Sequence, residues 1–197
     1  MNSENLLLIF IKNPIPGKVK TRLAKDLGEE KAVKYYKKLL KITRKESEKT
    51  DAVKWLCYGD FINENDNWTR EVFVKKQQFG NNLGDRMSSF FKEGFESGFK
   101  RIVIIGSDCP DLVSSDLDQA FKILAKADAV IGPANDGGYY LLGLSKNVNL
   151  FQDKEWSTES VFKDTLEDFK KENLTFEILA EKIDLDTVED LKNFPNL

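Results

Sequence analysis

The chain contains no histidine, and this absence excludes several kinds of enzyme site. Ser-His-Asp and Cys-His nucleophilic mechanisms both need an imidazole base, so neither operates here. The two cysteines, Cys57 and Cys109, lie far apart in the sequence, form no CxxC motif and have no histidine beside them to complete a zinc site. We therefore interpret both as reduced thiols of a cytoplasmic protein.

The sequence also lacks a long apolar run and an excess of charge of one sign. The longest apolar run near the start, Leu6 to Ile11, is too short for the core of a signal peptide or for a membrane span. The net charge is only −3, and basic and acidic residues are interspersed, so no basic field favours nucleic acid. We expect a cytoplasmic protein without a membrane span and without a nucleic-acid partner.

What is present is typical of one globular domain, residues 1–197, with 41% hydrophobic and 32% charged residues. Short apolar runs alternate with segments of helical period, which predicts an α/β fold with a mostly parallel sheet. We expect strands over 6–11, 53–58, 71–77, 102–105, 128–133, 139–144 and 176–179, with the strand 139–144 antiparallel. We expect helices over 26–49, from the turn at 77–87 to about 95, over 114–125 and 159–171, and a short one at the C-terminus. Ser157 or Thr158 is the expected N-cap of the helix 159–171.

Asp108 follows the buried strand 102–105 and stands just before a proline. In an open α/β sheet, ligands bind at the carboxyl ends of the strands. A carboxylate at that edge suits Mg²⁺ or Mn²⁺ that bridges phosphates. The alternative is that Asp108 only caps the turn or the helix that follows.

The loop after the first strand, residues 12–23, is shaped by two prolines and Gly17. It contains four cations and a hydroxyl, which together have the chemistry of a phosphate cradle: Lys12, Lys18, Lys20, Thr21 and Arg22. It is not a Walker P-loop, which needs GxxxxGK[ST]. A solvated basic turn is the alternative.

Three further places supply polar groups to the same predicted edge. The Gln78 amide can hydrogen-bond a base or a sugar hydroxyl. The Arg86 guanidinium can pair with a phosphate, and the alternative is an ordinary salt bridge with a surface acid. The corner Asp136-Gly137-Gly138-Tyr139 is either a plain hairpin or part of a sugar or acceptor pocket. Asp184 and Asp186 either cap the last helix, for which Thr187 is the better cap, or supply a second metal ligand.

Taken together, these segments resemble the DUF2064 proteins. The motifs run in that family's order: Lys12-x-Pro14-x-Pro16-Gly17-Lys18-x-Lys20-Thr21-Arg22-Leu23, Leu83-Gly84-x-Arg86-Met87, Gly106-Ser107-Asp108-Cys109-Pro110, Asp136-Gly137-Gly138-Tyr139-Tyr140 and Asp184-x-Asp186-Thr187. The resemblance covers nearly the whole chain. It implies a GT-A type glycosyltransferase within the nucleotide-diphospho-sugar transferase superfamily, with a Rossmann-like α/β/α fold.

By this resemblance, Asp108 stands where the superfamily has its metal-binding acid, with Asp184 or Asp186 as a second ligand of Mg²⁺ or Mn²⁺. The first loop stands where nucleotidyltransferases have a glycine-rich triphosphate loop, and its single glycine and two prolines disfavour a triphosphate-cleaving role.

The resulting hypothesis is a metal-dependent transferase that uses a nucleotide sugar, with Asp136 as the general base. One alternative is a nucleotidyltransferase that joins an NTP to a phosphorylated acceptor and releases pyrophosphate. The other is a non-catalytic nucleotide-binding protein. The base, the sugar, the acceptor and the oligomeric state are not specified by these residues.

Overall fold

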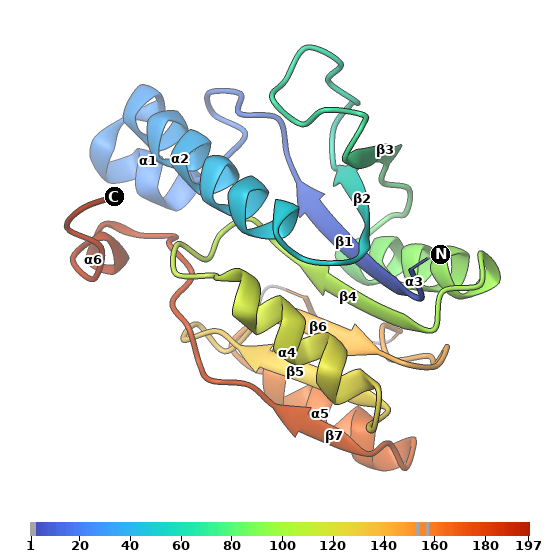
Figure 1. Ribbon diagram of the computed structural model, residues 1–197. Coiled ribbons are helices and arrows are strands. Elements are labelled where there is room, and N and C mark those ends of the chain that lie inside the picture. The colour runs from blue at the N-terminus through green and yellow to red at the C-terminus, as the bar shows by residue number, and fades with distance from the viewer. Residues whose placement is uncertain (1–2, 153, 157) are drawn as a thin grey trace.

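The computed structural model describes residues 3–152, 154–156 and 158–197, and its centre is a seven-stranded sheet (Figure 1). The strands are β1 (Asn5–Ile11), β2 (Val53–Tyr58), β3 (Phe73–Gln77), β4 (Arg101–Ile105), β5 (Ala129–Pro133), β6 (Tyr139–Leu144) and β7 (Phe176–Ile178). The helices are α1 (Thr21–Leu27), α2 (Glu29–Glu48), α3 (Leu83–Glu96), α4 (Ser114–Leu124), α5 (Val161–Lys171) and α6 (Val188–Leu191).

The strand order is β3-β2-β1-β4-β6-β5-β7, and β6 alone among these strands runs antiparallel to its neighbours. The predicted mostly parallel sheet with an antiparallel strand over 139–144 is therefore confirmed. Because β1, β2, β3 and β4 are parallel, their carboxyl ends meet at one edge of the sheet. The amino end of β6 reaches the same edge, since β6 runs in the opposite direction.

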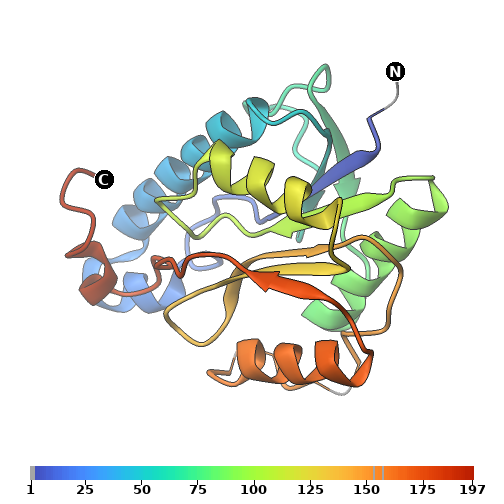
Figure 2. The same ribbon diagram turned by 60° about the horizontal axis from the view of Figure 1, so that its bottom comes forward.

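Helices cover both faces of the sheet, which gives the predicted three layers (Figures 1 and 2). On one face, the apolar side chains of α4 belong to the same hydrophobic cluster as Leu7 and Ile9 of β1. On the other face, α3 lies against Leu6, and the apolar side chains of α3 and α5 share a second cluster with Leu6 and Leu8. The alternation follows from the period of two along a strand, and both sets are apolar because β1 is buried on both sides.

Close packing of α3 depends on Gly94. A Cβ at this position would lie 2.6 Å from Ile102 Cδ1 and 2.8 Å from Leu6 Cδ2, so only glycine lets the helix approach the sheet this closely. The start of α3 is fixed by Asn82, whose side-chain oxygen accepts the Asp85 N–H at 2.8 Å. This cap places the first turn of α3 beside the carboxyl ends of β1 and β2.

Two predicted boundaries are corrected by the structure, and the start of α4 at Ser114 agrees with the prediction. Residues 21–23, expected in the loop, begin α1, and Gly28 with φ +82° separates α1 from α2 where one helix was expected. The first residue before α4 is Val113, and Asp116 accepts the Val113 N–H at 3.0 Å.

Before α5 the N-cap position is held by Ser160. The hydroxyl of Thr158 donates to the Glu155 carbonyl instead, and Ser157 lies outside the described residues. At α6, the predicted cap Thr187 is confirmed: its hydroxyl accepts the Asp190 N–H at 3.4 Å.

No helix among residues 3–152, 154–156 and 158–197 has the length and apolar character that crossing a membrane requires.

Candidate nucleotide and metal site

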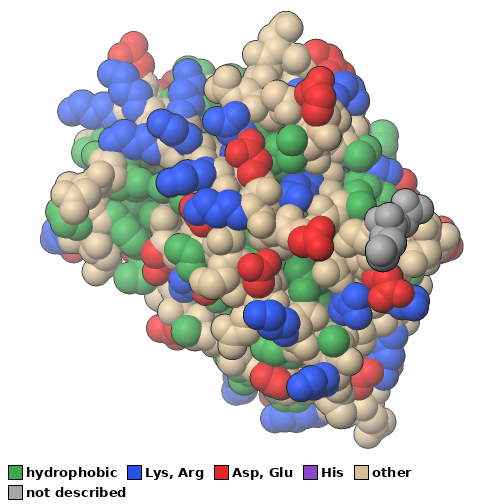
Figure 3. All heavy atoms as spheres, viewed as in Figure 1, with side chains coloured by type: hydrophobic (Ala, Val, Ile, Leu, Met, Phe, Trp, Pro, Cys, Tyr) green, Lys and Arg blue, Asp and Glu red, His purple; other side chains and the backbone are tan. Residues whose placement is uncertain are grey.

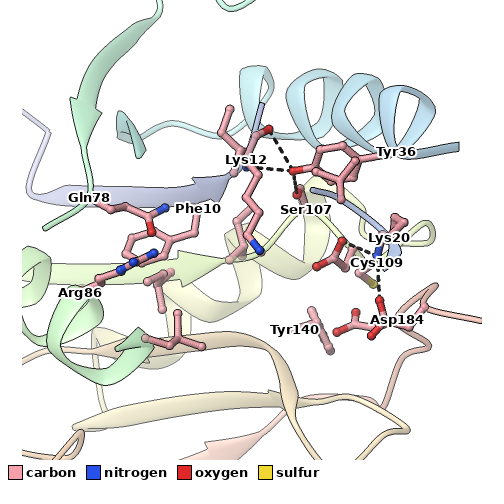
Figure 4. Close-up of a pocket in the computed structure, with 18 of the residues that line it drawn as sticks. Phe10, Lys12, Lys20, Tyr36, Gln78, Arg86, Ser107, Cys109, Tyr140 and Asp184 are labelled. Atoms are coloured by element: carbon pink, nitrogen blue, oxygen red, sulfur yellow. Dashed lines mark hydrogen bonds and ion pairs between the residues drawn. The ribbon is translucent and has the colours of Figure 1, made fainter. Parts of the chain in front are cut away.

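A cavity of about 670 Å³ opens at the edge of the sheet where β1 and β4 end. Eleven of the predicted site residues line it: Lys12, Lys18, Lys20, Thr21, Arg22, Gln78, Arg86, Asp108, Tyr139, Asp184 and Asp186. Figure 4 shows the labelled ones in two groups, with Gln78 and Arg86 at one end and Lys20 and Asp184 at the other. Side chains from distant parts of the sequence thus meet at the edge that sheet topology predicts.

Lys20 holds the acidic end of the cavity together. Its ammonium lies 2.5 Å from Asp108 Oδ1 and 3.0 Å from Asp186 Oδ1, and its side chain is only 3% exposed. Burial alone would lower the pKa of this ammonium, but the two carboxylates outweigh burial and raise the pKa above its ordinary value. Lys20 is therefore a cation at neutral pH.

The backbone of Lys20 is unusual. Its φ of 48° and ψ of 45° lie in the left-handed region, which residues other than glycine seldom adopt. This conformation occurs at the residue that precedes α1, and it turns the chain so that the ammonium faces Asp108 while the helix runs away from the site. No local sequence signal indicates this conformation, since lysine is not a residue that left-handed positions favour.

Asp184 lies beside this ion pair and is the most perturbed acid of the site. Its Oδ1 is buried and accepts no hydrogen bond. Burial, then the charges of Asp108 and Asp136, raise the pKa of Asp184 to about 8 from 3.8, although Lys20 opposes the rise. A buried carboxylate oxygen that has no partner and lies among other acids needs a positive charge beside it. The structure therefore shows a place where a cation would be stabilised.

The carboxylate oxygens of these acids are suitable ligands for a hard divalent cation. Asp108 is 46% exposed to the cavity, and Asp184 has an oxygen without a partner, so the two offer oxygen ligands of the kind that Mg²⁺ and Mn²⁺ prefer. Within the described part of the chain, no three acids or cysteines are grouped closely enough to hold a metal by themselves. Water and substrate phosphates would have to complete the coordination, as is usual for Mg²⁺.

Tyr36 of α2 joins the two loops that carry the site, although its spacing along the helix is only that of a buried core residue. Its buried hydroxyl accepts the Lys12 N–H at 2.9 Å, donates to the Lys12 carbonyl at 3.2 Å and lies 3.1 Å from Ser107 Oγ (Figure 4). Burial, then the negative charge of Asp108, raises the pKa of Tyr36 to about 12, so the hydroxyl stays protonated. A tyrosine hydroxyl has one donor and two acceptor positions, and these contacts use all three.

The other end of the cavity combines apolar and polar surface. The Gln78 amide nitrogen donates to the Cys57 carbonyl at 2.7 Å, which leaves its oxygen free to accept. The contact that the structure gives Arg86 is with a backbone carbonyl, that of Gly80, at 3.3 Å. Phe10 lines the same cavity as these two side chains. A planar ring with N–H donors suits this end.

Lysines and arginines also gather on the surface over α1 and α2 (Figure 3). Arg22 is 61% exposed, and its guanidinium lies 3.6 Å from Asp186 Oδ2. The approach to the cavity from this side is therefore positive, which favours an anionic ligand.

Residues 42–158 match the family model described as "Uncharacterized protein conserved in bacteria (DUF2064)". The chain belongs to the DUF2064 family. No curated protein matches it as a relative.

Solved structures place this DUF2064 protein in a wider fold group. A protein from Desulfovibrio desulfuricans G20, provisionally assigned as a nucleotide-diphospho-sugar transferase, is 33% identical, with a TM-score of 0.88 over 96% of this chain and 85% of that one. A CMP-2-keto-3-deoxy-manno-octonic acid synthetase in complex with CTP is 10% identical, with a TM-score of 0.57 over 97% and 96% of the two chains.

Rv0371c from Mycobacterium tuberculosis H37Rv, in complex with manganese, is 13% identical, with a TM-score of 0.53 over 98% of each chain. These two distant likenesses show the fold alone. The predicted fold, that of the nucleotide-diphospho-sugar transferases, is confirmed.

The remaining predicted site residues of this DUF2064 protein, Gly17, Asp136, Gly137 and Gly138, do not line the cavity. Asp136 Oδ1 accepts the Gly138 N–H at 2.9 Å, which closes the turn between β5 and β6. Gly137 has φ +86°, and a Cβ there would overlap the backbone of Glu159. The turn therefore requires glycine at position 137 for structural reasons, without any contact to a ligand. Asp136 is nevertheless close enough to Asp184 to raise the pKa of that acid.

Proposed function

We propose that this DUF2064 protein is a metal-dependent transferase that uses an activated nucleotide donor, a nucleotide sugar, and transfers the sugar to an acceptor. The observation that carries the proposal is the pair Asp108 and Asp184. They face one cavity at the carboxyl edge of the sheet, and one of them has a buried oxygen without a partner. The relationship to the Desulfovibrio protein supports the same class of donor.

In this proposal, Asp108 and Asp184 hold Mg²⁺ or Mn²⁺, with Asp186 as a further acid beside them. The bound cation would neutralise the charge that develops on the diphosphate leaving group. Lys18 and Arg22 bind phosphate oxygens from the loop side, because both line the cavity and both are cations. The manganese complex of Rv0371c and the CTP complex of the synthetase support a metal and a nucleotide in a site on this fold.

The other end of the cavity would bind the base or a sugar hydroxyl through the free oxygen of Gln78 and the guanidinium of Arg86. Tyr139 would border the acceptor: its hydroxyl lies 3.7 Å from Met87 Sδ, and burial raises its pKa, so it remains a neutral hydroxyl at physiological pH. We keep Asp136 as the proposed general base. Its carboxylate would have to leave the Gly138 N–H to reach an acceptor hydroxyl.

A second candidate is a nucleotidyltransferase that joins an NTP to a phosphorylated acceptor. The likeness to the CTP-bound synthetase over nearly the full length of both chains favours it. The two candidates differ in product, because the nucleotidyltransferase releases pyrophosphate and the glycosyltransferase releases a nucleotide that still carries its phosphates.

The test is a turnover assay with UDP-, GDP-, ADP-, dTDP- and CMP-linked sugars and with the four NTPs, each offered to water and to many hydroxyl and phosphorylated acceptors, in Mn²⁺ or in EDTA, with release of nucleotide and of pyrophosphate measured separately. Metal-dependent release of nucleotide from a sugar donor, lost in Asp108→Asn and kept in the exposed control Asp118→Asn, is the expected result. Pyrophosphate release from an NTP would favour the second candidate. Tight nucleotide binding with no product from any donor across many acceptors would indicate a non-catalytic binding protein.

A further inference from the structure

The ammonium of Lys20 stands where the positive charge of a metal would be needed. It contacts Asp108 and Asp186 directly, and both carboxylates line the cavity and are partly exposed, 46% and 36%. An ion pair that only stabilised the fold would have no need of carboxylates that face a ligand cavity. The adjacent Asp184 still has a buried oxygen without a partner. One ammonium therefore leaves this group of three acids short of positive charge.

A divalent cation on Asp108 would lie close to Lys20. Two positive charges about 4 Å apart repel each other by well over the thermal energy, even at an effective dielectric constant of about 20. The ammonium is 3% exposed, so water screens this repulsion only weakly. Metal and ammonium thus compete for the same carboxylate.

Lys20 also has an alternative partner when substrate is present. An ammonium has three N–H donors, and the contacts with Asp108 and Asp186 use two of them. A phosphate of a bound nucleotide would offer oxygens to the same group, and Lys18 and Arg22 flank the cavity on that side.

We propose that Lys20 is an internal competitor for the divalent cation, which holds Asp108 and Asp186 in the ligand-free protein and leaves Asp108 for the metal when a diphosphate binds. The inference rests on the proposed function, because it assumes the metal site. It adds that metal binds weakly to the free protein and more tightly once phosphate is present, and the coupling is reciprocal.

The experiment measures two dissociation constants for each protein. One is that of Mn²⁺ alone, from the electron paramagnetic resonance signal of free Mn²⁺, and the other is that of inorganic pyrophosphate in EDTA, from calorimetry. The proteins are wild type, Lys20→Gln, Lys20→Gly and the control Lys25→Gln. Lys25 is an exposed lysine in the last turn of α1, so its removal changes the net charge by the same amount. Lys20→Gly keeps the test available if glutamine does not tolerate the left-handed position.

We expect both Lys20 variants to bind Mn²⁺ at least about tenfold more tightly than wild type and pyrophosphate about tenfold more weakly, because the carboxylates gain a free oxygen while phosphate loses a cation. Lys25→Gln should change neither constant by more than about twofold. The decisive result is that the two dissociation constants change in opposite directions. A substitution that only disordered the site would weaken the binding of both Mn²⁺ and pyrophosphate.

Weaker binding of both probes, or Mn²⁺ affinity equal to that of wild type, would overturn the inference. If wild type binds both probes in that case, the proposed function survives the failure. If neither wild type nor the Lys20 variants bind Mn²⁺, even with saturating pyrophosphate, the metal dependence of the proposed function fails as well.

Discussion

Replacing Asp184 with asparagine should stabilise the metal-free protein at alkaline pH. Folding raises the pKa of Asp184 to about 8 from 3.8, mainly through burial and the neighbouring acids Asp108 and Asp136. The folded state therefore holds a proton that the unfolded state releases. This contribution to stability is fully present below about pH 4 and is lost as the pH rises through about 8. Asparagine has the same shape and does not titrate.

The size of the effect follows from the pKa shift. Each unit of pKa difference corresponds to about 1.4 kcal/mol, so between pH 5 and pH 9 wild type should lose on the order of 4 kcal/mol relative to Asp184→Asn. The chain suits this measurement because it has no histidine, the side chain that ordinarily titrates in this range. Groups that titrate in both proteins cancel in the difference between them.

The assay is urea denaturation of wild type, Asp184→Asn and the surface control Asp118→Asn in EDTA at several pH values. We expect the free energies of unfolding of wild type and Asp184→Asn to diverge with rising pH, while the control runs parallel to wild type. Parallel curves for all three proteins would refute the reasoning, because Asp184 would then be an ordinary ionised acid.

Two further predictions concern packing. Tyr36→Phe removes a hydroxyl that three buried hydrogen bonds share and should lower the free energy of unfolding by about 2–4 kcal/mol, while Tyr35→Phe, one residue away, should change it by less than about 0.5 kcal/mol. Equal effects in urea denaturation would contradict the role given to Tyr36. Gly137→Ala should destabilise the protein by at least about 2 kcal/mol more than Gly98→Ala, because both glycines have positive φ but only Gly137 has Glu159 backbone against its missing Cβ. Similar melting temperatures for the two alanine variants would show that the turn adjusts freely.

Much of the fold is visible in local pattern. The β-branched and leucine runs of β1, β4 and β5 predict buried strands because both faces of each strand are covered. The paired glycines 137 and 138 predict the turn that makes β6 antiparallel. The split between α1 and α2 was missed, because a single glycine within a lysine-rich helical pattern is compatible with a continuous helix.

The sequence predicted many of the residues that line the cavity, but not the contacts between them. Sequence position at the ends of strands indicated that Asp108 and the first loop meet at one edge, and the cavity bears this out. The pairing of Lys20 with Asp186 spans 166 residues, and no local signal encodes it. Tyr36 has the spacing of a core residue, so its hydroxyl bond to the Lys12 backbone follows only from the packing of α2 against the sheet.

The measurement that tests the central claim most directly is the thermal stability of wild type and Asp108→Asn with nucleotide diphosphates, nucleotide sugars and NTPs, each with and without Mn²⁺. A ligand at about 100 times its dissociation constant adds about 2.7 kcal/mol, which for a protein of this size raises the melting temperature by roughly 5–10 °C. We predict such a rise for one nucleotide diphosphate or its sugar, only with Mn²⁺ and only in wild type. No rise with any nucleotide, or an equal rise in Asp108→Asn, would contradict the assignment of this site.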